Sequence, residues 1–190
     1  MTIRRPVGAR KGDILELFDK KKLPEIEAAG HFVITIAKDV QEHWSSIVAE
    51  LNEIFKSDDS ISDDEYTGFE FTLAVISTQI QALNNLLPKD QADRIREYIL
   101  QCISSPELGS YPRDTIAEYQ NAWDESISQG EPPFFGVASV LYDKLECKDK
   151  VELENAKFKS PLMLMALSEK TVKFAGSWWR DVTQKFKLVR

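Results

Sequence analysis

The longest periodic pattern in the chain lies between residues 29 and 56. Apolar side chains recur there at intervals of three and four residues, which is the spacing of one face of an α-helix. The residues that follow this spacing are Phe32, Val33, Ile36, Ala37, Val40, Trp44, Ile47, Val48, Leu51, Ile54 and Phe55. The pattern therefore predicts an amphipathic helix over about 29–56.

The rest of the chain repeats this helical spacing in shorter segments. Helices are expected over 13–23, 63–87 and 89–104, after Pro112, after the Gly130–Pro133 turn, and from Pro161 to the end. No segment of useful length alternates apolar and polar residues as a strand does. We predict an all-α fold, a single-domain helical bundle of six or seven helices over 13–190, with a flexible basic N-terminal arm at 1–12.

Composition and charge limit the kinds of partner. The chain has 190 residues, 43% hydrophobic and 29% charged, which is typical of a soluble globular domain. Its net charge is −7, and positive residues concentrate at both ends. Because phosphate neutralisation supplies most non-specific affinity for nucleic acid, an acidic body indicates that no nucleic acid is bound. The basic ends leave a membrane surface open as a less favoured partner.

The cysteines and the N-terminus indicate the compartment. Cys102 and Cys147 form neither a disulfide framework nor a metal-ligand spacing, so they are expected to be buried or half-buried thiols. The N-terminus has no apolar signal region, and no run of 18 apolar residues occurs. We expect a cytoplasmic protein that uses no cofactor.

No catalytic residue can be nominated from the motifs. The chain has two histidines, no glycine loop of the phosphate-binding kind, and no Gly-x-Ser-x-Gly turn. Asp39 and His43 lie four residues apart on one side of the 29–56 helix, where an exposed ion pair is favoured over metal ligation.

Glu70 lies between Phe69 and Phe71 in an apolar helix. Helix geometry favours an exposed side chain; if buried, the carboxyl needs a raised pKa or a partner such as Arg96 or Arg113. Asp39, His43 and Glu70 together are the residues of an alternative metal site.

An acidic run occupies residues 57–65 and includes Asp63 and Asp64. Acidic side chains are favourable at a helix N-terminus, so the run is expected to be a solvated loop that caps the helix beginning near Asp63. The alternative is a docking patch for a basic partner.

Aromatic residues concentrate in the second half of the chain. Phe134 and Phe135 follow the Gly130–Pro133 turn and either enter the core or face a partner. On a helical wheel Trp178 and Trp179 share one apolar stripe of a continuous last helix, in which Gly176 is the weak point. Packing onto the bundle is favoured over a membrane-surface or partner-binding helix.

These observations favour a non-catalytic interaction or regulatory protein that binds another protein through acidic and aromatic surfaces. The expected binding residues are Asp63, Asp64, Phe134, Phe135, Trp178 and Trp179. A metal-dependent hydrolase and a peripheral membrane binder that uses the basic termini are the alternatives. Homo-oligomerisation stays open.

Overall fold

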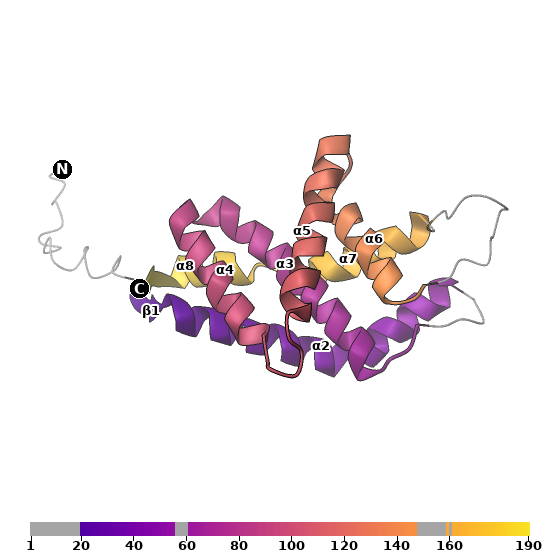
Figure 1. Cartoon of the computed structure of the whole chain (residues 1–190), viewed down its shortest axis with the longest axis horizontal. Helices are drawn as coiled ribbons and strands as arrows, with labels where there is room; N and C mark the ends of the chain where they lie inside the picture. The colour runs from indigo at the N-terminus through magenta and orange to yellow at the C-terminus, as the bar shows by residue number, and fades with distance from the viewer. Residues whose placement is uncertain (1–19, 56–60, 148–158, 160) are drawn as a thin grey trace, which may run out of the picture.

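The computed structural model describes residues 20–55, 61–147, 159 and 161–190, and its elements are helical apart from two short strands (Figure 1). They are β1 (Lys21–Pro24), α2 (Glu25–Phe55), α3 (Glu65–Leu86), α4 (Lys89–Ile103), α5 (Tyr111–Gln129), α6 (Pro133–Lys144), α7 (Pro161–Ala175), α8 (Trp178–Lys185) and β2 (Phe186–Val189). The predicted all-α helical bundle is confirmed. The predicted arm at 1–12 and residues 13–19 of the first expected helix lie outside the described residues, as do residues 56–60 of the acidic run.

Helix α3 lies at the centre of the bundle and contacts each of the other described helices. All ten residues from Phe71 to Ile80 are buried, including the polar ones. A helix that is buried on all sides loses the one-sided pattern that sequence reasoning uses. The predicted bounds of 63–87 nevertheless match α3 closely.

The long predicted helix is α2, which packs closely against the first turns of α3. Asp64 caps α3 by accepting a hydrogen bond from the backbone N–H of Thr67 at 2.9 Å, and Trp44 of α2 donates its indole N–H to Thr67 Oγ1 at 3.1 Å. Gly68 lets the two helices approach, because a Cβ there would lie 3.1 Å from the Trp44 ring.

The prediction of one continuous helix from Pro161 to the end of the chain is wrong. Helix α7 ends at Ala175, and Gly176 takes a left-handed backbone conformation with φ of 55°. The Gln79 side chain of α3 donates to the carbonyl oxygens of Ala175 and Gly176, which satisfies groups that a helix end leaves without partners. Helix α8 then starts at Trp178.

The first and last described elements form a small parallel sheet. Residues 21–23, expected in a helix, are in β1, and Phe186, expected on the apolar stripe of the last helix, begins β2. Leu23 lies opposite Leu188 in the register. Pro24 helps to explain why residues 21–23 are extended and not helical, because the residue before a proline disfavours helical backbone angles.

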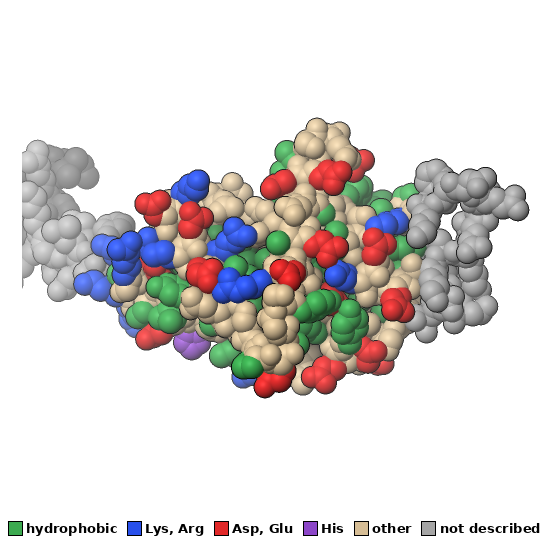
Figure 2. All heavy atoms as spheres, viewed as in Figure 1, with side chains coloured by type: hydrophobic (Ala, Val, Ile, Leu, Met, Phe, Trp, Pro, Cys, Tyr) green, Lys and Arg blue, Asp and Glu red, His purple; other side chains and the backbone are tan. Residues whose placement is uncertain are grey.

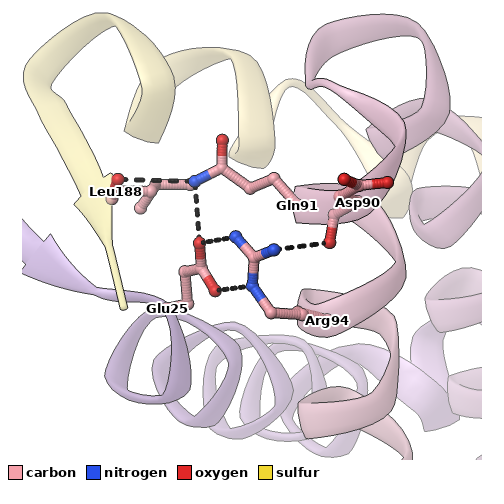
Figure 3. A network of polar contacts seen from close by, with 5 residues as sticks. All are labelled: Glu25, Asp90, Gln91, Arg94 and Leu188. Atoms are coloured by element: carbon pink, nitrogen blue, oxygen red, sulfur yellow. Dashed lines mark hydrogen bonds and ion pairs between the residues drawn. The ribbon is translucent and has the colours of Figure 1, made fainter.

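An ion pair between a buried carboxylate and a half-buried arginine joins this sheet to α2 and α4 (Figure 3). Glu25 is only 1% exposed, and Arg94 donates to its two carboxylate oxygens at 2.8 and 2.9 Å. Gln91 donates to Glu25 Oε1 at 2.9 Å and to the carbonyl oxygen of Leu188 in β2 at 3.3 Å. The hydrogen bond from Arg94 lowers the pKa of Glu25, so this carboxylate stays charged at neutral pH.

Candidate functional site

A groove of about 650 Å³ lies between α2 and α3 and reaches the last turn of α4. We call it the α2–α3 groove. Its apolar lining includes Val33, Ala37, Trp44, Phe69, Leu73 and Ile76. Cys102 and Ile103 of α4 also line it.

The apolar residues that line the groove differ in burial. Trp44, Leu73 and Ile76 are buried, whereas Val33 and Phe69 are half-buried. Ala37, expected in the buried stripe of its helix, is exposed. The apolar stripe of α2 is therefore wider than α3 covers, and this excess width is the sequence signal that could have located the groove.

One end of the groove is acidic. Asp63, Asp64 and Glu65 line it, and no lysine or arginine does. Asp64 is committed to capping α3; the backbone N–H of Thr67 lowers the pKa of its carboxyl. Asp63 and Glu65 are exposed and form no hydrogen bond or ion pair with any side chain in the described ranges. Their charges are therefore available to a ligand.

Cys102 lies at the α4 side of this groove and is exposed, which corrects the expectation of a buried or half-buried thiol. Cys147 is half-buried, and the two cysteines are not joined in a disulfide. Partial desolvation raises the pKa of the Cys102 thiol, so it is uncharged at neutral pH.

The two phenylalanines after the Gly130–Pro133 turn lie away from the α2–α3 groove, and one of them lines a second pocket. Phe135 lines a pocket of about 550 Å³ between α5, α6 and α7, whereas the Phe134 ring packs edge-to-face on Trp123 at 4.9 Å between centroids. Lys159 also lines this pocket and donates to Ser139 Oγ at 2.7 Å and to Asp143 at 2.6 Å.

The two C-terminal tryptophans lie in a third place. Trp179 is completely buried, and its ring centroid is 5.2 Å from that of Phe32. Trp178 is half-buried, also 5.2 Å from Phe32. The six expected binding residues are thus distributed over three places, and of these Asp63 and Asp64 lie on the larger groove.

The residues of the alternative metal site are not brought together. Asp39 and His43 are exposed on α2, and His43 Nδ1–H donates to the Asp39 backbone carbonyl oxygen at 2.8 Å in place of the expected ion pair. Glu70 lies in the core on α3. Within the described ranges, no group of three or more His, Cys, Asp or Glu residues is placed to hold a metal ion.

Glu70 is completely buried, which corrects the expectation of an exposed side chain. Tyr111 donates to its Oε1, and the Tyr119 hydroxyl donates to its backbone carbonyl oxygen at 3.5 Å. Burial raises the pKa of Glu70, although the hydrogen bond from Tyr111 acts in the opposite direction.

The partners considered for a buried Glu70 are engaged elsewhere. Arg96 donates to Gln120 at 2.7 Å, and Arg113 forms an ion pair with Glu97 at 2.6 Å. The hydrogen-bond partner of Glu70 is instead Tyr111, the first residue of α5, which the sequence pattern did not indicate.

Comparison of the chain with protein-family profiles, curated proteins and solved structures found no match. Among the described residues, no helix combines the length and the apolar character needed to cross a membrane.

Proposed function

We propose that this protein is a non-catalytic interaction or regulatory protein whose α2–α3 groove binds a basic, amphipathic helical segment of a partner protein. One observation carries the proposal: a groove with a largely apolar lining has three acidic residues at one end and no basic residue in its lining. In this proposal the acidic end of the groove is the principal contact with the partner. The half-buried ring of Phe69 supplies the aromatic contact, in place of the phenylalanine and tryptophan pairs expected from the sequence.

The shape of the groove favours a helical ligand. Amphipathic helices lay an apolar face into grooves between helices, using anchors one turn apart. Exposed Ala37 and half-buried Val33 and Phe69 offer such anchors a partly hydrated surface, and covering it is favourable by roughly 25 cal/mol per Å² of apolar area.

The charges at the groove end favour lysine or arginine in the ligand. Asp63 and Glu65 have no partner in the described part of the chain, so a cation placed beside them breaks no existing ion pair. Such charges at the rim accelerate association and fix the direction of the bound segment. We place this interaction in the cytoplasm, where the thiol of Cys102 in the groove would stay reduced.

The proposal is tested with a fluorescent peptide that forms an amphipathic helix with leucines on one face and lysines on the other. Its affinity for the intact chain is measured by fluorescence anisotropy. We expect saturable binding that weakens with added salt. Replacing Asp63 and Glu65 together by lysine is expected to weaken binding by about tenfold, equivalent to about 1.4 kcal/mol.

A matched control carries the same change in net charge outside the groove. Asp124 and Glu169 are exposed and do not line it, so replacing both by lysine is expected to leave affinity almost unchanged. An equal loss in both double variants would show that only net charge attracts the peptide. Asp64 is left intact because it caps α3.

A further inference from the structure

The end of the molecule that holds β1 and β2 carries a surface of the opposite charge. Figure 2 shows lysine and arginine side chains, in blue, gathered at this end, and Figure 1 places the C-terminus beside β1 there. The strands are four residues each and pair in parallel. A sheet of two short strands is only marginally stable by itself.

The register places two lysines side by side. Lys22 lies directly opposite Lys187, and both are exposed. Their neighbours Leu23 and Leu188 are half-buried against the core, so the alternation of a strand places the lysines on the outer face. Neighbouring strands are about 4.8 Å apart, and like charges directly opposite each other destabilise a sheet.

No acidic side chain of the described residues compensates this pair. Among the described residues, neither Lys22 nor Lys187 forms an ion pair. An anionic ligand on the outer face would therefore relieve a repulsion as well as gain an attraction.

The sheet also has an unpaired edge. It contains two strands, so each has one side without a strand partner in the described ranges. On β2, Gln91 of α4 hydrogen-bonds the Leu188 carbonyl oxygen. Apart from its bonds to β2, the backbone of residues 21–23 makes no hydrogen bond with another described residue. An edge of this kind is a template for an added strand.

We propose that the β1–β2 sheet docks an acidic, extended segment of a partner protein, which adds as a strand beside β1. Alternate side chains of that segment lie on the face of Lys22 and Lys187, where its carboxylates form ion pairs with the lysines. This surface is separate from the α2–α3 groove, and it selects a ligand of the opposite charge.

The probe is a short fluorescent peptide of alternating glutamate and valine, titrated against the intact chain by anisotropy. Replacing Lys22 by glutamate is expected to weaken binding at least about tenfold. Lys38 is exposed on α2, away from the sheet, so Lys38→Glu carries the same charge change and is expected to retain binding. In the double variant Lys22→Glu, Lys187→Glu, an alternating lysine–valine peptide is expected to bind instead.

Two measurements separate docking from loss of the sheet and from simple charge attraction. Lys22→Glu places opposite charges across the strands, so thermal unfolding is expected at the wild-type temperature or above it. A glutamate–valine peptide N-methylated along one edge keeps its charge and loses the donors of strand pairing, and is expected not to bind.

The proposal would be overturned by glutamate–valine binding that ignores Lys22→Glu, or by equal affinity for the N-methylated peptide. It would also be overturned if vesicles of phosphatidylserine and phosphatidylcholine bound in a Lys22-dependent way while the peptide did not. That last result would identify an anionic membrane as the ligand, since bilayer attraction also uses basic residues.

Discussion

Tyr111 of α5 donates its phenolic hydrogen bond to Oε1 of Glu70, a completely buried carboxyl in the second turn of α3. The second oxygen, Oε2, has no hydrogen-bond partner among the described residues. Lys144 and Glu118 act on this carboxyl from α6 and α5 with opposite signs. Burial is the largest effect and raises the pKa of Glu70 above its ordinary value of 4.5.

The raised pKa predicts that the contribution of Glu70 to the free energy of unfolding falls as pH rises. Between the pKa of the unfolded chain and that of the folded chain, the folded protein holds more protons at Glu70, so the free energy of unfolding decreases as pH rises. The total decrease is about 1.4 kcal/mol for each unit by which the pKa is raised.

The Glu70→Gln variant cannot titrate at this position. Its stability relative to wild type is expected to increase between about pH 4 and pH 7, measured by urea unfolding at each pH. Glu169→Gln is the control, because Glu169 is exposed on α7 and is not among the charges that act on Glu70. Curves for Glu70→Gln and wild type that stay parallel over this range would contradict the raised pKa.

The Glu25–Arg94 pair predicts the opposite dependence on pH. The pKa of Glu25 is lowered, so the pair contributes stability above the pKa of the unfolded chain and loses it as pH falls through the folded value. Arg94→Met is therefore expected to destabilise the protein most near neutral pH, with the difference closing below about pH 4.

Arg113→Met provides a matched comparison at the exposed Arg113–Glu97 pair, whose side chains are 39% and 51% exposed. Its effect on unfolding is expected to be smaller at every pH, because exposed pairs contribute little. Equal losses in the two variants would show that the buried carboxylate at Glu25 has no special requirement for its arginine.

Gly136 allows α6 to cross α5 at close range. A Cβ at this position would lie 2.1 Å from the backbone carbonyl oxygen of Ala122, and a backbone atom cannot rotate away. Gly136→Ala is expected to destabilise the fold by about 2 to 3 kcal/mol in chemical unfolding.

Gly30 supplies the reference for this substitution. It lies within α2, and a Cβ there would meet no atom within 4 Å. Gly30→Ala is expected to stabilise the protein by about 1 kcal/mol, the ordinary helix preference of alanine. A mild effect of Gly136→Ala would mean that α5 and α6 separate easily.

Helical periodicity was sufficient to predict the all-α fold and most helix bounds, because apolar spacing is a local property of the chain. It failed for the first and last described elements, which pair as strands. The parallel pairing of β1 with β2 joins segments more than 160 residues apart, and no local pattern encodes such pairing. Gly176, the weak point of the expected continuous helix, follows the last residue of α7, although a glycine costs a helix interior only about 1 kcal/mol.

The site was predictable only in part. The acidic residues Asp63 and Asp64 were expected at a helix start, and Asp64 does cap α3. The wide apolar stripe of α2 was a signal for the groove beside them, but how far α3 covers that stripe depends on packing. Packing of the tryptophan-bearing segment onto the bundle was expected from its apolar stripe, whereas the complete burial of Trp179 against Phe32 depends on the tertiary structure.

Protection of Cys102 from a thiol reagent tests the proposed groove most directly. Cys102 is exposed and lines the α2–α3 groove, whereas Cys147 is half-buried outside its lining and serves as the internal reference. The rate of maleimide addition at each thiol is followed by mass spectrometry, with and without the leucine–lysine peptide.

We expect the peptide to slow modification of Cys102 at least about tenfold while Cys147 reacts at an unchanged rate. In the variant with Asp63 and Glu65 replaced by lysine, this protection is expected to disappear at the same peptide concentration. Unchanged modification of Cys102 at saturating peptide, or equal slowing at both thiols, would contradict binding in the groove.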